Sequence, residues 1–318
     1  MAAAIETEEL TKDFLVGFWR KRPYRALDGL SIQVQAGEVF GFLGPNGAGK
    51  STALKLLMQL LYPTRGMATI LGRPLGDPSM KRRIGFLPEN PYFYDYLTAE
   101  ELLAYFARLF GHTGADVAAR VARALDEVGL AGERRMRLRQ FSKGMVQRVG
   151  LAQALLNDPE VVFLDEPMSG LDPLGRKRVR DIIVGLRKRG CTVFFSSHIL
   201  SDAEALCDRV AVLVQGRLVG IGRISEILNV DLKGWELVVA SLPPTATPAL
   251  AGRTRRITQL SDGHTLLELP SDVAPEALMQ ELAGQGARTI SLNPIRETLE
   301  DYFVESVAAA ALRKTGGI

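Results

Sequence analysis

The sequence has little of what marks membrane-spanning, disulfide-bonded or nucleic-acid-binding chains. No stretch of its 318 residues reaches the run of about 18 apolar residues that a spanning helix needs. Its only cysteines, Cys191 and Cys207, exclude a disulfide framework and are typical of a reducing compartment. Lys and Arg number 39 against 36 Asp and Glu, and a net charge of +3 indicates no nucleic-acid footprint. The first ten residues, MAAAIETEEL, lack the pattern of a signal peptide.

The composition that is present is that of a folded chain with about two domains. Hydrophobic residues make up 47% and charged residues 24%, close to an ordinary globular protein, which excludes pervasive disorder. At roughly 150 residues per domain, the length suggests two domains. The pattern breaks near Ile227–Gly234. We therefore predict one α/β domain over residues 1–228 and a smaller α/β domain over residues 229–318.

The first domain alternates short apolar runs with helical patterns, which favours a parallel sheet with crossover helices. Residues 98 to 157 have an almost entirely helical pattern, and we expect a helical subdomain over about residues 90–157. Thr98 and Glu101 have the spacing of a capping box at its start. Two segments, Ser31–Val34 and Met67–Leu71, are expected in a separate antiparallel sheet. The strands predicted for the parallel sheet are Glu38–Leu43, Ile84–Leu87, Val161–Leu164, Thr192–Ser196 and Val210–Val214.

The second predicted domain contains strands and helices but no chemical motif. Its Pro-rich segment Leu242–Ala249 is typical of a loop. Predicted strands are Trp235–Leu242, Thr265–Leu269 and Thr289–Leu292, and predicted helices lie near Pro275–Ala283 and Glu297–Val307.

A phosphate-binding loop follows the first predicted strand of the parallel sheet. Residues 44–52, GPNGAGKST, match G-x-x-x-x-G-K-[ST] between a strand and a helix. Glycines let backbone N–H groups turn inward around an anion, and the helix N-terminus adds partial positive charge. Lys50 then neutralises the β- and γ-phosphates, and the Ser51 hydroxyl ligates Mg²⁺. The nucleotide-binding residues predicted here are Gly44, Asn46, Gly47, Gly49, Lys50, Ser51 and Thr52.

Acidic residues and a histidine follow two further predicted strands. Asp165 and Glu166 end the apolar run 161–164, and ligands of open α/β sheets bind at the carboxyl ends of strands. We expect Asp165 to hold Mg²⁺ through water and Glu166 to act as the general base. His198 follows the strand predicted at residues 192–196 and is a candidate for contact with the γ-phosphate; a structural role for this histidine stays equally open.

These segments, in this order, resemble the nucleotide-binding subunit of ATP-binding cassette (ABC) transporters over about residues 5–225. The run Phe141–Arg148, FSKGMVQR, resembles the family signature, and Ser169–Asp172 resembles its D-loop. His198 takes the place of the switch histidine, and Ile84–Glu89 that of the Q-loop. Phe14 corresponds to the aromatic residue that stacks on adenine, with Tyr24 as the second candidate because the loop from Phe14 to Ala26 looks extended.

The resemblance implies an ATP-hydrolysing subunit that works with Mg²⁺. It implies a head-to-tail dimer in which Ser142 and Gly144, at the start of a helix, close on the γ-phosphate held by the partner. Asp172 would then lie at the dimer interface. An ordinary helix cap at Ser142 is compatible with the same atoms. Separate transmembrane permease subunits would hold the dimer at the cytoplasmic face of the membrane.

Two departures from the family pattern bear on mechanism. Glu89 stands where the family usually has Gln, and an ionised carboxylate accepts hydrogen bonds but cannot donate them. We expect Glu89 to remain a contact on the metal side of the site; a Glu89→Gln chain with unchanged hydrolysis and transport would exclude that role. Lys143 and Met145 also depart from the signature. The combination resembles the type-2 exporter branch.

A soluble cassette ATPase acting on DNA or ribosomes is the alternative. Only 92 residues separate Lys50 from Ser142, too few for the long coiled coil of chromosome and repair ATPases, and the chain has one phosphate loop. We therefore expect no nucleic-acid partner. The sequence leaves the roles of two basic segments undecided. Phe18–Arg25 is either a solvated loop or a contact with anionic lipid headgroups or a membrane partner. The second segment is either a solvated surface or a contact with nucleotide or with a partner's acidic side chains, and its basic residues are Arg134, Arg135, Arg137 and Arg139.

Overall fold

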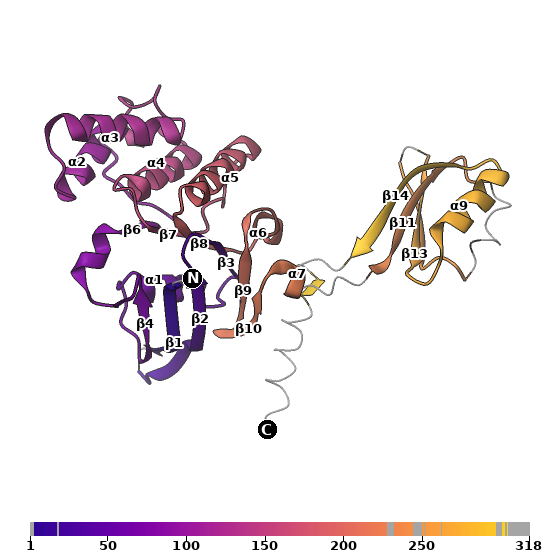
Figure 1. The fold of residues 1–318 in the computed structure, drawn as a ribbon, viewed down its shortest axis with the longest axis horizontal. Helices are drawn as coiled ribbons and strands as arrows, with labels where there is room; N and C mark the ends of the chain where they lie inside the picture. The colour runs from indigo at the N-terminus through magenta and orange to yellow at the C-terminus, as the bar shows by residue number, and fades with distance from the viewer. Residues whose placement is uncertain are drawn as a thin grey trace. The chain divides into compact units, whose positions relative to one another are not determined.

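The computed structural model describes residues 3–17, 19–227, 232–243, 250, 252–261, 263–296, 301–302 and 304. They form two compact units, the first within Met1–Ile227 and Phe303–Ile318 and the second within Leu228–Tyr302 (Figure 1). The first unit contains two sheets and the second contains one. The predicted helix near Glu297–Val307 and the predicted loop Leu242–Ala249 lie largely outside the described residues. No helix in the described part of the chain combines the length and apolarity needed to cross a membrane.

The larger sheet of the first unit has the strand order β10-β9-β3-β8-β7-β6. Pairing is parallel from β6 through β7, β8 and β3 to β9, and antiparallel only between β9 and β10. The five parallel strands lie where the apolar runs predict them. Strand β10 escapes prediction because Gly220 and Gly222 interrupt its apolar pattern. The strands are β3 (Val39–Leu43), β6 (Ile84–Leu87), β7 (Val161–Asp165), β8 (Thr192–Ser197), β9 (Arg209–Val214) and β10 (Arg217–Gly222).

A second, antiparallel sheet in the same unit has the order β2-β1-β4-β5. The segments Ser31–Val34 and Met67–Leu71 do belong to this sheet, with β1 between them. Strand β1 itself is hard to predict, because several register shifts break the alternation of buried and exposed residues along it. The strands are β1 (Ala3–Val16), β2 (Arg22–Gln35), β4 (Arg65–Ile70) and β5 (Arg73–Pro74).

Three helices pack on one another beyond the edge of the parallel sheet that β6 forms: α2 (Ala99–Leu109), α3 (Gly114–Glu127) and α4 (Lys143–Leu155) (Figure 1). The capping box is confirmed, since Thr98 accepts from the Glu101 N–H and Glu101 accepts from the Thr98 N–H. The expectation of nearly continuous helix over residues 98–157 is wrong for residues 128–142. Gly129 takes a φ of 65° just after α3, and within that stretch only the short η2 (Leu138–Gln140) is helical.

The remaining helices of the first unit are α1 (Lys50–Leu57), α5 (Pro173–Lys188), α6 (Leu200–Leu206), α7 (Ile224–Ile227) and the short η1 (Pro78–Arg82). The core shared by both sheets is apolar and rich in aromatic residues: Phe40, Phe42, Phe163 and Phe194 are fully buried, and three of these rings contact the ring of Phe194. This core fixes the strands whose ends carry the site.

The second unit is one antiparallel sheet of order β12-β13-β11-β14 with helix α9 (Pro275–Gly284). Buried and half-buried residues alternate along β13, as expected for a sheet with one face against a core. That core contains Leu237, Leu267 and Leu282. The strands are β11 (Leu232–Ala240), β12 (Arg256–Gln259), β13 (Thr265–Pro270) and β14 (Arg288–Arg296).

The order of the parallel strands brings three predicted functional segments to one edge of the larger sheet. Strand β8 lies between β3 and β7, with Leu43 opposite Ser197 and Asp165 opposite Ser196. The phosphate loop, His198 and the acidic pair therefore follow the carboxyl ends of neighbouring strands, where open α/β sheets bind ligands.

Candidate functional site

The phosphate loop runs from the end of β3 into α1, as its motif predicts. Gly47 and Gly49 take φ angles of 80° and 105°, which side chains rarely adopt. A Cβ atom at Gly49 would also lie only 2.4 Å from the Ala26 carbonyl oxygen. Glycine is therefore required at residue 49 for both conformation and space. The loop leads into the N-terminus of α1, whose first residue is Lys50.

Lys50 forms the centre of a small buried charge cluster. Its Nζ donates to the carbonyl oxygens of Gly44 and Pro45, at 2.7 and 3.3 Å, and lies 3.2 Å from Glu166 Oε1. His198 Nδ1 lies 2.8 Å from the other carboxylate oxygen, Oε2 of Glu166. Lys50 and Glu166 are only 5% and 6% exposed, so each charge depends on the other for compensation.

Glu166 combines a strained backbone with an acceptor that no hydrogen bond reaches. Its φ of 50° lies in the left-handed region, a conformation that costs about 1–3 kcal/mol in non-glycine residues and is concentrated at functional sites. Its Oε1 is buried and accepts no hydrogen bond from the residues described. Lys50 Nζ, 3.2 Å away, is its charged neighbour among the residues described, so this oxygen keeps unused capacity to accept hydrogen bonds.

Ser196, which the sequence analysis did not assign to the site, holds the two acidic residues in place. Its buried hydroxyl donates to Asp165 Oδ1 at 2.6 Å and accepts from the Glu166 backbone N–H at 3.0 Å. The only sequence signal is a small polar residue at the carboxyl end of an otherwise apolar strand. Such a residue is equally typical of a simple strand end, which is why the pattern alone does not assign it.

A pocket of about 580 Å³ joins the phosphate loop to the β1–β2 hairpin. Phe14 and Tyr24 lie directly opposite each other in this hairpin and both line the pocket, so the segment between them is a hairpin rather than the extended loop expected. Lys12 Nζ lies 5.3 Å from the centre of the Phe14 ring. Predicted residues that line the pocket are Phe14, Asn46, Gly47, Gly49, Lys50, Ser51, Thr52, Glu89, Glu166 and His198. Its volume is within the range of small-molecule sites.

Other predicted residues do not line this pocket. Gly44 lies next to the pocket, because its carbonyl oxygen accepts a hydrogen bond from Lys50. Asp165 accepts a hydrogen bond from Ser196, whose hydroxyl also accepts from the Glu166 N–H. Ser142 caps α4 by accepting from the Met145 N–H, and Gly144 lies in the first turn of that helix. Asp172 caps α5 by accepting from the Gly175 N–H at 2.8 Å. Within one copy of the chain, Ser142, Gly144 and Asp172 therefore lie at helix starts apart from the pocket, whereas Ser169, in the segment that resembles the D-loop, lines it.

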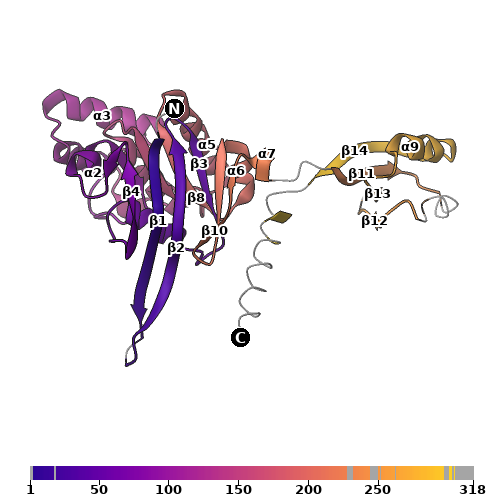
Figure 2. The ribbon, with the colours of Figure 1, turned by 60° about the horizontal axis from the view of Figure 1, so that its bottom comes forward.

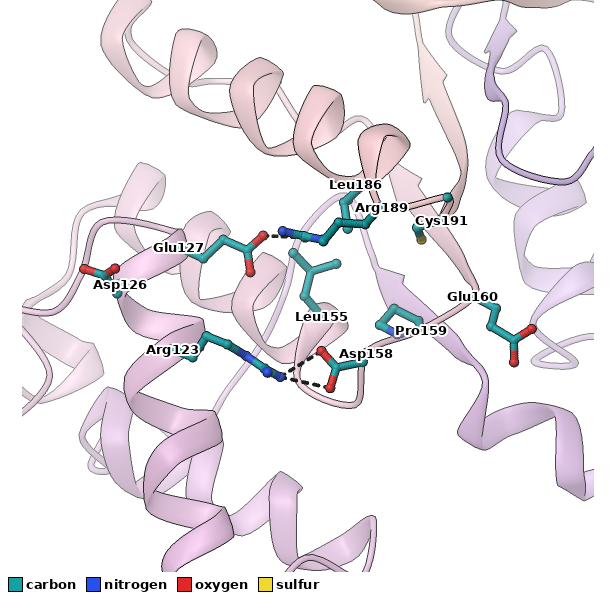
Figure 3. Close-up of a pocket in the computed structure, with 11 residues that line it drawn as sticks. Arg123, Asp126, Glu127, Leu155, Asp158, Pro159, Glu160, Leu186, Arg189 and Cys191 are labelled. Carbon is teal, nitrogen blue, oxygen red and sulfur yellow. Dashed lines mark hydrogen bonds and ion pairs between the residues drawn. The ribbon is translucent and has the colours of Figure 1, made fainter.

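A second pocket, of about 510 Å³, lies among the ends of α3, α4 and α5 and shares no residue with the first (Figure 3). Four of its charged side chains pair with one another: Arg123 points to Asp158, and Arg189 to Glu127 (Figure 3). Burial raises the pKa of the Cys191 thiol to about 12, so this cysteine is neutral at physiological pH. These features indicate a structural junction between helices.

Comparisons with known proteins identify the family. The family model described as ABC transporter matches residues 27–169. An uncharacterized ABC transporter ATP-binding protein of Synechocystis sp. is 47% identical over 96% of this chain and 85% of its own length. The chain belongs to the ABC transporter ATP-binding proteins. The bacitracin transport ATP-binding protein of Enterococcus faecalis is 33% identical over 98% of the chain and 99% of its own length. The fluoroquinolones export ATP-binding protein of Mycobacterium tuberculosis is 41% identical over 71% of the chain and 74% of its own length.

Solved structures agree with this family. The structure titled as an ATP binding subunit of an ABC transporter is 32% identical, with a TM-score of 0.62, over 70% of this chain and 91% of its own. A dimeric ATP-binding cassette bound to ADP and Pi is 25% identical, with a TM-score of 0.63, over 69% of this chain and 98% of its own. The predicted fold, an ABC-type ATPase core with an antiparallel subdomain and a helical subdomain, is confirmed. The chain is an ATP-binding subunit of an ABC transporter, from a family whose domain hydrolyses ATP.

Proposed function

We propose that this chain hydrolyses ATP in the pocket between the phosphate loop and the β1–β2 hairpin, and that the reaction drives export through separate membrane-spanning subunits. The relatives named for bacitracin transport and fluoroquinolones export support an exporter. None of the relatives reported above is named for an action on DNA or ribosomes. The proposal leaves the exported substrate open, since contacts to it belong to the membrane subunits.

The observation that carries the proposal is the convergence of Lys50, Glu166 and His198 on one pocket. Phosphate oxygens compete with the Gly44 and Pro45 carbonyls for the Lys50 ammonium. The backbone N–H groups of the loop stabilise the remaining negative charge of the phosphates by donating hydrogen bonds. Glu166 accepts a proton from the attacking water through Oε1. His198, whose Nδ1 is held by Glu166, presents its other ring nitrogen to the γ-phosphate.

The donor set of the pocket suits Mg²⁺. The Ser51 hydroxyl and the Glu89 carboxylate line it, and Asp165 lies beside Glu166 in sequence; all offer hard oxygen ligands. Mg²⁺ in such sites keeps several waters and uses one or two carboxylates together with phosphate oxygens. Bound Mg²⁺ would neutralise charge on the phosphates, with Ser51 as a direct ligand and Asp165 acting through water. Glu89 would add a further carboxylate on the same side.

We also propose a head-to-tail dimer, and the predicted residues left outside the pocket support it. Ser142 is exposed and begins α4, where backbone N–H groups and the helix dipole attract an anion. A second copy would bring this helix start to the γ-phosphate, with Asp172 at the interface. The dimeric structures of similar cassettes support such an assembly. We further propose that residues 1–228 form the ATP-binding domain, that residues 229–318 form an accessory domain, and that permease subunits keep the dimer at the cytoplasmic face of the membrane.

Phosphate release by the full chain, with Mg²⁺ present or chelated, tests the proposal. We expect hydrolysis that requires Mg²⁺ and falls at least tenfold in His198→Ala. His112→Ala is the matched control, because His112 pairs with Asp116 and Asn157 away from the pocket and its loss leaves the rate unchanged. An equal loss in both variants, or no binding of Mg²⁺-ATP, would contradict the assignment. Co-purification with membrane-spanning proteins that depend on this hydrolysis tests the transport role.

A further inference from the structure

The β1–β2 hairpin extends well past the nucleotide pocket. Figure 2 shows the two strands running side by side to a turn that projects beyond the rest of the first unit. The last paired residues are Val16 and Arg22, two positions beyond the Phe14–Tyr24 pair that lines the pocket. We call residues 15–22 the hairpin tip; the structure describes all of them except residue 18.

Large apolar side chains gather on the hairpin tip instead of in a core. Trp19 is 91% exposed, Leu15 70% and Val16 47%. The other tryptophan, Trp235, packs against the core of the second unit, as a tryptophan in a folded domain usually does. Single exposed apolar residues are ordinary, but three within five positions of a projecting turn indicate a contact surface.

The same turn carries a local excess of positive charge. Arg20, Lys21 and Arg22 are exposed, and none of them forms an ion pair with another residue that the structure describes. The nearby acidic side chains are already engaged, because Arg25 bridges Asp13 and Asp28 at 2.8 and 3.0 Å. Residues 15–22 contain no acidic residue, so the hairpin tip has three cations to offer.

We propose that the hairpin tip binds the surface of an anionic lipid membrane. Trp19 and Leu15 would enter the headgroup layer, where the amphipathic indole ring is favoured, and the three cations would meet lipid phosphates. Charge alone would suit nucleic acid equally, but the exposed Leu15 and Val16 have no partner there. An acidic protein surface would bind mainly through the three cations, and Trp19 would then contribute less to binding than the cations do. A lipid surface uses both features of the tip at once.

Sedimentation of the full chain with vesicles tests this inference. Vesicles of phosphatidylcholine with an equal share of phosphatidylglycerol should bind the chain at low salt, and vesicles of phosphatidylcholine alone should bind it far more weakly. The triple variant Arg20→Gln, Lys21→Gln and Arg22→Gln should weaken binding by roughly a hundredfold, and added salt should do the same to the natural chain. Trp19→Ala should lower binding at every salt concentration.

A matched control removes the same charge elsewhere. The triple variant Arg134→Gln, Arg135→Gln and Arg139→Gln alters exposed cations within the helical subdomain and should keep vesicle binding within about twofold of the natural chain. ATP affinity checks the fold of both triple variants, since Phe14 and Tyr24 in the same hairpin line the nucleotide pocket. A Trp235→Phe chain leaves Trp19 as the only tryptophan of the sequence. The fluorescence emission of Trp19 should shift to shorter wavelength when anionic vesicles are added.

Three results would overturn the inference. One is the absence of binding to anionic vesicles by a chain that binds ATP normally. Another is an equal loss of binding in the tip variant and in the control variant. The third is a tip variant that binds vesicles normally but no longer co-purifies with membrane-spanning proteins, which would assign the hairpin tip to a protein partner. ATP hydrolysis is measured separately, so failure here leaves the proposed ATPase function standing.

Discussion

The two units of the chain bury different kinds of side chain. The first unit buries Lys50, Asp165, Glu166 and Ser196 at one edge of its parallel sheet, whereas Thr265 is the only polar residue buried among the described residues of the second. Burying a charge costs several kcal/mol unless it is paired, so such groups persist mainly where function requires them. The contrast points to the first unit for the proposed chemistry, while the described core of the second unit is almost entirely apolar.

Breaking the buried charge pair should have the largest effect on stability. Lys50→Met leaves Glu166 buried without its cation and should lower the free energy of unfolding of the first unit by about 3–5 kcal/mol. Adding Glu166→Gln to Lys50→Met removes the uncompensated charge and should recover most of that loss, while hydrolysis stays absent. Urea denaturation of the two single variants and the double variant measures the coupling. Additive losses would show that the two charges do not depend on each other.

One substitution made in both units sharpens the contrast. Leu237→Ala in the second unit and Leu213→Ala in the first each empty a fully buried site and should each cost about 2–5 kcal/mol. Leu213 lies beside Gly49 of the phosphate loop, so its loss should also weaken ATP binding. Leu237→Ala should leave ATP affinity and hydrolysis unchanged. Thermal unfolding and ATP titration of both variants check this; loss of ATP affinity in Leu237→Ala would contradict separate roles.

Removing the hydroxyl that bridges the acidic residues should have a smaller effect. Ser196→Ala leaves Asp165 Oδ1 and the Glu166 N–H without their partner and should cost about 1–3 kcal/mol of stability. The turnover number should fall more than the Michaelis constant changes, because Glu166 loses its fixed position. Ser197→Ala is the control: among the residues that the structure describes, its hydroxyl bonds only to the Ile199 backbone, so the turnover of this variant should stay near normal. Equal turnover in both variants would reduce Ser196 to a structural role.

Much of the fold could be predicted because its signals are local. The five parallel strands are short, largely apolar and almost entirely buried, and the capping box at Thr98 and Glu101 needs only residues three positions apart. The phosphate loop is equally local in its backbone, since Gly47 and Gly49 take positive φ angles within one turn.

The rest depends on contacts between distant residues. Strand β1 contains shifts of register that only pairing with β2 and β4 explains, and the hairpin that joins Phe14 to Tyr24 looks like a loop from sequence alone. Ser196 acquires its role because β8 lies beside β7, which places residue 196 opposite residue 165. Gly129 ends the helix in the structure with its positive φ angle, but glycine is also tolerated inside helices, so the sequence alone does not predict a break there.

The central claim is that Glu166 activates water in an ATP site built at the carboxyl edge of the parallel sheet. Single-turnover hydrolysis of ATP by a Glu166→Gln chain, with ATP binding measured on the same sample, tests it most directly. We predict that ATP still binds while the rate of hydrolysis falls by about a hundredfold or more, because the amide cannot take the proton. A Glu166→Gln chain that binds ATP and hydrolyses it at the natural rate would contradict the claim.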